Sequence, residues 1–127
     1  MKKEGRKISI VTGASSGLGR DIAKLLSKKG HTTYVVARRN DALIELKNEC
    51  SKNKNSGEIK VIAGDLTDSK FRESIIKQVL KESKKIDYLI NNAGFGKLID
   101  FEDTELKDIE GMYALNSIAG QHLAQLV

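Results

Sequence analysis

A glycine-rich turn that directly follows a short strand pattern constrains the fold of this chain more than any other feature of its sequence. Residues 7–11 alternate β-branched and polar side chains, which is typical of a strand, and they run directly into Thr-Gly-Ala-Ser-Ser-Gly-Leu-Gly at positions 12–19. From Leu18 onward the apolar residues recur at helical spacing, and Gly30 supplies a stop. Glycines before a helix let backbone N–H groups approach a phosphate closely, but they also serve plain tight turns. The turn alone therefore leaves both interpretations open.

The rest of the chain alternates strands with helices. The patterns predict strands at residues 7–11, 32–37, 58–63 and 87–91, and helices that begin near residues 18, 40, 68 and 104, the last of which runs to residue 127. Such alternation implies parallel strands joined by right-handed crossovers, with helices on both faces of one sheet. The sequence predicts an α/β, doubly wound parallel sheet. The second strand lies at roughly the spacing that dinucleotide-binding folds require after the glycine turn, which favours nucleotide binding.

Local signals also predict helix caps and buried faces. Asn40 or Asp41 is expected to cap the second helix, and Thr67 or Asp68 the third. The predicted apolar face of the third helix consists of Phe71, Ile75, Val79 and Leu80. The predicted apolar stripe of the last helix consists of Leu106, Ile109, Tyr113, Asn116, Gly120 and Leu123, so Tyr113 is expected in the core and Asn116 is expected to be a buried amide.

Composition excludes several classes of protein. The chain has 127 residues, of which 39% are hydrophobic, and its apolar runs are far too short for a membrane span. Cys50 is the only cysteine, which excludes an internal disulfide and favours a cytoplasmic protein.

Charge is unevenly distributed along the chain. Residues 1–63 carry 14 basic and 6 acidic residues, whereas residues 64–127 carry 8 basic and 11 acidic residues, so the first half favours anions. We expect neither nucleic-acid binding nor a metal site, because there is no basic stripe with interleaved aromatic residues and His31 and His122 have no credible metal partner.

Four motifs in order resemble the short-chain dehydrogenase/reductase family. Residues 12–19 match its TGxxxGxG cofactor turn, Asp65-Leu66 its contact after the third strand, residues 91–94 (Asn-Asn-Ala-Gly) its fourth-strand motif, and Asn116 its mid-helix asparagine. The resemblance implies a Rossmann-like sheet with the strand order 3-2-1-4 for this part of the family fold. It implies that the cofactor contacts Gly13, Ser15, Ser16, Gly17, Leu18, Gly19, Arg38, Arg39, Asp65, Leu66, Asn92, Ala93 and Gly94.

The end of the second strand predicts which nicotinamide cofactor is bound. Family members that prefer NAD carry an Asp there, whereas this chain has Ala37 followed by Arg38 and Arg39. Arginine presents a planar, permanently charged fork to a phosphate. We expect Arg38, with Ser15 and Arg39, to hold the 2′-phosphate of NADP(H), although a solvated surface pair is the alternative.

Other motif residues have ordinary structural alternatives. Asp65 either contacts adenine or caps the next helix, and Asn91 and Asn92 either form a turn or line the carboxyl edge of the sheet, where doubly wound folds bind ligands. Asn116 is either a structural bridge or part of a site. The resemblance implies that Asn116 is both, bending its helix and positioning a water in the proton relay.

The proton donor of the family is not found in this sequence. The family uses a Ser together with a Tyr and a Lys four residues later, but positions 38, 92 and 117, which follow the three tyrosines by four, hold Arg, Asn and Ser. We therefore expect residues 1–127 to be a single NAD(P)-binding domain, incomplete at its C-terminal side and inactive alone. It would be part of an enzyme that reduces a carbonyl or oxidises an alcohol.

Two other hypotheses remain open. One is a non-catalytic NADP-binding or regulatory module, and the other is a self-associating fragment without activity. Because Leu89 and Ile90 would lie on an exposed edge strand, we expect a homo-oligomer that associates through that edge or through the last helix.

Overall fold

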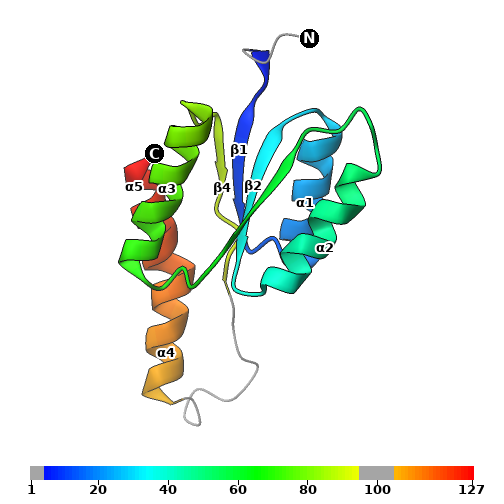
Figure 1. Cartoon of the computed structure of the whole chain (residues 1–127). Helices are drawn as coiled ribbons and strands as arrows, with labels where there is room; N and C mark the ends of the chain where they lie inside the picture. Colours follow the sequence, from blue (N-terminus) through cyan, green and yellow to red (C-terminus); the bar gives the residue numbers. More distant parts are fainter. Residues whose placement is uncertain (1–4, 95–104) are drawn as a thin grey trace.

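The computed structural model describes residues 5–94 and 105–127. Its centre is one parallel sheet, whose strands are β1 (Ile8–Thr12), β2 (Thr32–Ala37), β3 (Ile59–Ala63) and β4 (Tyr88–Ile90). The strand order is β3-β2-β1-β4, which confirms the predicted order (Figure 1). In this register Val11 lies opposite Val35 on one side and Ile90 on the other.

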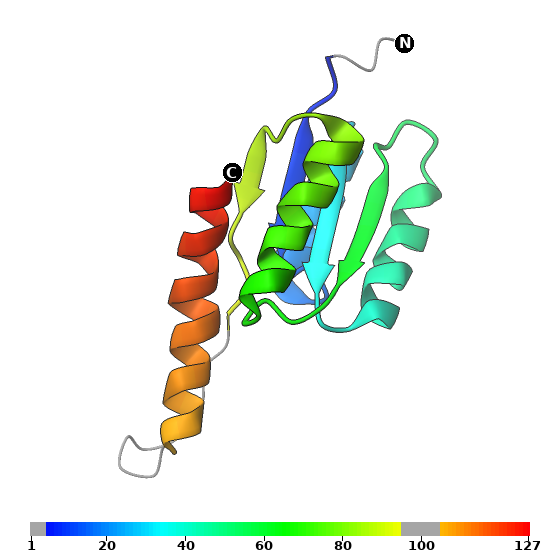
Figure 2. The same cartoon turned by 60° about the vertical axis from the view of Figure 1, so that its left-hand side comes forward.

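Helices cover both faces of the sheet, as the strand–helix alternation predicts. One face is covered by α1 (Gly17–Lys28) and α2 (Asn40–Ser51), and the other by α3 (Ser69–Ser83) and the C-terminal helix (Figures 1 and 2). Ile10 and Tyr34 face α3, whereas Val11 and Val35 face α2, and all four are fully buried. Because both faces are covered, every residue of β1 and β2 is buried, including the polar residues Ser9, Thr12, Thr32 and Thr33.

The last helix is divided into three parts. It consists of α4 (Leu106–Tyr113), the π-helical segment η3 (Ala114–Ala119) and α5 (Gly120–Leu126). The predicted start at residue 104 lies outside the described residues. A π-helical turn widens the backbone spiral and is frequent at functional sites.

The predicted buried stripe of this helix is wrong in its first half. Leu106 is 69% exposed and Tyr113 is 66% exposed, so Tyr113 is not a core residue. Asn116 is also exposed and is not a buried amide. The reason is that α4 extends past the carboxyl edge of the sheet (Figure 2), whereas Ala119 and Leu123 lie against α3 and the sheet and are buried.

Two other local predictions need correction. Arg39, not Asn40 or Asp41, occupies the N-cap position of α2, because its backbone is extended and Asn40 is already helical. Leu80 is 43% exposed, and Ile76 is buried in the core cluster that includes Ile75 and Val79. The cap of α3 is Asp68, whose carboxylate accepts the Lys70 N–H at 3.0 Å, as one of the two predicted alternatives states.

Across residues 5–94 and 105–127, no helix combines the length and the apolar character that crossing a membrane requires.

Candidate functional site

The glycine turn between β1 and α1 is packed against the end of β4. Gly13 has φ +66° and Gly17 has φ +58°, a region that glycine adopts without strain. A Cβ on Gly13 would lie 2.8 Å from the Cα of Ala93, and one on Gly19 would overlap the carbonyl oxygen of Gly13 and the side-chain amide of Asn92. Gly13 and Gly19 are therefore required by close backbone approach, whereas nothing described lies within 4 Å of the Cβ position of Gly17.

The N-terminus of α1 presents backbone N–H groups without a compensating acidic residue. Ser16 is the N-cap residue, with extended backbone at φ −159°, but its side chain makes no capping hydrogen bond. The first turn of α1 contains no acidic side chain, and Leu18 is 67% exposed. The positive end of the helix dipole therefore stays available to an anion.

A cavity of about 350 Å³ lies beside this turn at the carboxyl edge of the sheet. The ends of β1, β2, β3 and β4 and the C-terminal helix all contribute to it. Its lining residues are Gly13, Ser15, Ala37, Arg38, Arg39, Gly64, Leu66, Ala93, Gly94 and Leu115. The structure thus brings together seven of the predicted cofactor residues, from four separate stretches of the chain.

Three lining residues, Ala37, Gly64 and Leu115, are not among the predicted cofactor contacts, and of these the sequence singled out Ala37 only for leaving the end of β2 without a carboxylate. A Cβ on Gly64 would overlap the ring of Phe71, and the position of this glycine directly after β3 was the available signal. Leu115 comes from η3 and carries no distinctive sequence signal, because it lies outside the apolar stripe expected for that helix.

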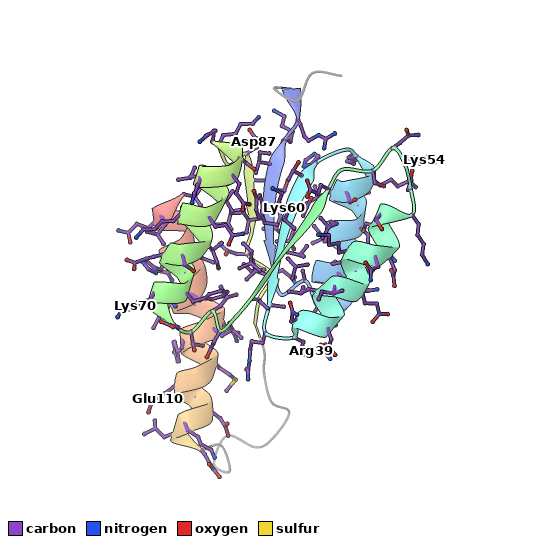
Figure 3. The ribbon with its side chains drawn as sticks, viewed as in Figure 1. Arg39, Lys54, Lys60, Lys70, Asp87 and Glu110 are labelled. Carbon is purple, nitrogen blue, oxygen red and sulfur yellow. The ribbon has the colours of Figure 1, made fainter. Side chains whose placement is uncertain are left out.

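Arg38 and Arg39 follow β2 directly and are exposed at the rim of the cavity. Figure 3 shows Arg39 at this end of the sheet. Ala37, the last residue of β2, places no carboxylate there, and Ser15 lies across the same cavity. Two guanidinium groups and a hydroxyl therefore surround the position after β2, an arrangement suited to a phosphate group.

The Asp65 side chain forms hydrogen bonds within the loop that follows β3. Its Oδ1 accepts the Thr67 N–H at 2.9 Å and the Thr67 hydroxyl at 2.7 Å. These hydrogen bonds lower the pKa of Asp65, and the Arg38 charge adds a smaller effect in the same direction. The side chain is exposed, and the neighbours Gly64 and Leu66, rather than Asp65, line the cavity.

The Thr12 side chain positions the segment that follows β4. Thr12 is 2% exposed, and its hydroxyl oxygen accepts the backbone N–H groups of Asn92 and Ala93, both at 3.0 Å. The amide of Asn92 donates to the carbonyl oxygen of Gly13 at 3.4 Å. Hydrogen bonds of the Thr12 and Asn92 side chains therefore join the ends of β1 and β4, beyond the last pair of residues that the two strands share.

The C-terminal helix contacts the same segment through its π-helical part. The Asn91 side-chain amide donates to the carbonyl oxygen of Gly120 at 3.1 Å, and a Cβ on Gly94 would lie 2.8 Å from Oδ1 of Asn116. Asn91 and Asn116 also line a small cavity of about 30 Å³ between β4 and this helix. Asn116 thus lies next to the predicted cofactor segment, although it is exposed.

Comparisons with known proteins agree on one family. The family model described as short chain dehydrogenase matches residues 7–127. The chain is 38% identical over 112 residues to 11-beta-hydroxysteroid dehydrogenase-like 3 of Arabidopsis thaliana. This match covers 87% of this chain and 36% of that protein. It is 39% identical over 119 residues to human dehydrogenase/reductase SDR family member 7, covering 92% of this chain and 35% of that protein.

Solved structures of similar fold contain NADP-type ligands. L-sorbose reductase from Gluconobacter frateurii, complexed with NADPH and L-sorbose, matches with a TM-score of 0.88 at 26% identity, over 96% of this chain and 46% of that chain. An alcohol dehydrogenase from Thermococcus sibiricus, complexed with 5-hydroxy-NADP, matches with a TM-score of 0.89 at 25% identity, over 95% of this chain and 51% of that one.

The chain spans about a third of the length of the curated relatives that it matches. The match to the family model nevertheless covers nearly every residue of the chain, and the fold matches the two solved structures over at least 95% of it. This chain belongs to the short chain dehydrogenase family.

Proposed function

We propose that residues 1–127 form one dinucleotide-binding unit that binds NADP(H), as the cofactor-binding part of an oxidoreductase acting on a carbonyl or alcohol substrate. The observation that carries this proposal is the cavity in which Arg38, Arg39 and Ser15 meet the glycine turn. Two solved structures of similar fold, one complexed with NADPH and the other with 5-hydroxy-NADP, support the choice of cofactor.

The residues present fit such a cofactor. Gly13 and Gly17 adopt the positive φ that brings backbone N–H groups to the start of α1, where no acidic residue of the first turn opposes a pyrophosphate. Arg38 and Arg39 would hold the 2′-phosphate. Leu66 lines the part of the cavity next to β3, where the adenine would lie, while Asp65 would shape that loop through Thr67.

Residues after β4 would position the nicotinamide end of the cofactor, where the reaction takes place. Thr12 holds the backbone of Asn92 and Ala93, and Gly94, which lies next to Asn116, follows them at the cavity. When bound, the nicotinamide supplies the hydride chemistry. In this proposal Asn116 is the one member of the family's catalytic set that this chain contributes, and its role is to hold a water for proton transfer.

The chain by itself is proposed to bind the cofactor without turnover. General acid catalysis needs a proton donor of suitable pKa beside the substrate carbonyl. None of Tyr34, Tyr88 and Tyr113 is followed by a lysine four residues later. The non-catalytic NADP-binding module therefore remains the second candidate, and it shares the same cavity.

A titration of the purified chain with NADPH and NADH, followed by nicotinamide fluorescence, tests the proposal. We expect NADPH to bind at least about tenfold more tightly, because one charge-assisted phosphate contact is worth about 1.5–3 kcal/mol. Equal affinities, or tighter NADH binding, would contradict it. An assay with ketones and aldehydes should show no NADPH oxidation, and measurable turnover would contradict the proposed lack of a proton donor.

We also propose that the chain self-associates through β4 and acts in the cytoplasm. Within the described part of the chain β4 pairs with β1 alone, and Tyr88 on this strand is 47% exposed. Light scattering at high concentration should give a mass above that of one chain, and a monomer would contradict self-association. Cys50, as the only cysteine, supports a reducing compartment.

A further inference from the structure

A second cavity lies at the opposite edge of the sheet from the candidate cofactor site. Its volume is about 670 Å³, and it forms where residues 5–7, residues 29–31 and residues 54–56 meet. Figure 3 shows Lys54 near the amino edge of the sheet and Arg39 at the carboxyl edge. The volume falls within the range of about 300–1,000 Å³ that is usual for small-molecule pockets.

Within the described part of the chain, the titratable side chains that line this cavity are all basic. They are Arg6, Lys7, Lys29, His31 and Lys54, with each of the three segments contributing at least one. Among residues 5–94 and 105–127, none of the four lysine and arginine side chains forms an ion pair. Asn55 and Ser56 add neutral hydrogen-bonding groups to the same lining.

Two acidic side chains of the described residues, Asp87 and Glu58, lie close to this cavity. Asp87 accepts the Ile8 N–H at 2.8 Å and pairs with Lys85 at 3.0 Å. Glu58 lines a neighbouring cavity, which shares Arg6, Lys54 and Ser56 with this one. Burial and the Lys29 charge lower the pKa of His31, Asp87 opposes this, and Lys7 adds to it, which is consistent with net positive surroundings.

The cavity walls are fixed by backbone contacts between the three segments. The Gly57 N–H donates to the Ser27 carbonyl oxygen at 2.7 Å, and the buried Ser27 hydroxyl donates back to the Gly57 carbonyl oxygen at 3.0 Å. The Thr32 N–H donates to the Lys7 carbonyl oxygen at 3.0 Å. A Cβ on Gly57 would overlap the carbonyl group of His31, so these turns are in close contact. A binding site with fixed walls loses less entropy when a ligand binds.

We propose that this cavity binds a small molecule that carries two or more phosphate groups, at a site separate from the cofactor cavity. The Arg6 guanidinium offers a two-pronged contact to phosphate oxygens, and Lys29 and Lys54 offer point charges from two other segments. A concave site of this size suits a compact polyanion better than a flat membrane surface or a nucleic-acid duplex.

The test is a titration of the ¹⁵N-labelled full chain with inorganic tripolyphosphate, followed by amide NMR shifts. We expect the amides of Gly30, His31, Asn55 and Ser56 to shift in a saturable manner. The double variant Arg6→Gln/Lys54→Gln should weaken binding by at least about tenfold, since it removes two charged contacts. The matched control is Lys70→Gln/Lys77→Gln, which removes the same charge from the exposed surface of α3 and should leave the affinity unchanged.

Three outcomes would overturn the proposal. The first is an equal loss of affinity in both double variants, which would indicate non-specific attraction to a basic protein. The second is a set of shifts confined to residues 13–19 and 38–39, which would place the anion in the cofactor cavity. The third is equally tight binding of citrate, which would show that the cavity does not select phosphate. Retained binding in an Arg38→Gln/Arg39→Gln variant would support two separate sites.

Discussion

Thr12 holds Asn92 across the junction between β1 and β4, with the Thr12 hydroxyl oxygen 3.0 Å from the Asn92 backbone nitrogen. The same oxygen accepts the Ala93 N–H at 3.0 Å and donates to the Ile90 carbonyl oxygen at 3.4 Å. One buried hydroxyl therefore fixes the course of the chain where the candidate site meets the edge strand.

Replacing Thr12 by valine keeps the side-chain shape but removes this acceptor. The N–H groups of Asn92 and Ala93 then lose their partner, so we expect Thr12→Val to lower the free energy of unfolding by about 1–3 kcal/mol. Urea denaturation followed by circular dichroism measures the change. Thr12→Ser is the control, because it keeps the hydroxyl, and a Thr12→Val protein that is more stable than Thr12→Ser would contradict this account.

Alanine at Gly19 should destabilise the protein, although alanine is normally the better helix former. A Cβ there would overlap the Gly13 carbonyl oxygen and the Asn92 amide, and relieving such overlap costs about 1–3 kcal/mol. Gly120→Ala is the matched control in the last helix, where the nearest atom to the added Cβ is Asn91 Cγ at 3.5 Å. There we expect a gain of up to about 1 kcal/mol. Thermal denaturation of both variants should give shifts of opposite sign, and shifts of the same sign would refute the packing argument.

Arg38 should control the preference between the two nicotinamide cofactors. We expect Arg38→Gln to weaken NADPH binding by about tenfold or more and to leave NADH binding almost unchanged, because only NADPH carries the 2′-phosphate. Fluorescence titration with both cofactors measures this. Lys70→Gln is the control for a general loss of positive charge. A parallel loss for NADPH and NADH would mean that Arg38 does not contact the 2′-phosphate.

The Tyr34 hydroxyl should stabilise the fold in a pH-dependent way. It donates to Glu82 at 2.9 Å and lies 2.8 Å from the Ser83 hydroxyl. This hydrogen bond is the main reason that the pKa of Glu82 lies below its ordinary value of 4.5, and Lys60 contributes further. A lowered carboxyl pKa adds stability that is present above pH 4.5 and is lost as the pH falls through the folded-state pKa.

We therefore expect Tyr34→Phe to cost about 1 kcal/mol at neutral pH and less once Glu82 is protonated. Urea midpoints measured between neutral pH and strongly acidic pH test this expectation. Tyr88→Phe is the control, because the described structure gives the Tyr88 hydroxyl no hydrogen bond while its ring stacks on His31. A Tyr34→Phe deficit that grows on acidification would contradict the assigned role of Glu82.

His31 should titrate below its ordinary pKa of 6.5. Burial is the largest cause, and the Lys29 charge is the next. Since the folded state then binds fewer protons than the unfolded state, the stability contributed by neutral His31 is present above pH 6.5 and falls as the pH drops toward the folded-state pKa. An NMR titration of the imidazole signals measures this pKa, and Lys29→Gln should raise it. A wild-type value at or above 6.5 would contradict the expected shift.

Much of the fold follows from short-range sequence patterns. The strand at residues 32–37 has the predicted bounds, and the glycine turn lies between β1 and α1 as expected. These features are local, since side-chain spacing distinguishes a strand from a helix and glycine adopts the positive φ of the turn without strain. The grouping of Ser15, Arg38 and Ala93 around one cavity also follows once parallel strands are expected, because their carboxyl ends meet at one edge.

Other features were settled by contacts between distant parts of the chain. The spacing of Leu106, Tyr113 and Asn116 describes one helical stripe, but the sheet ends before it covers that stripe, so these residues are exposed. The sequence by itself therefore determined the order of the elements and the residues at the carboxyl edge. Tertiary structure alone decided which helical faces are buried, because burial depends on the length and position of the surface against which a helix packs.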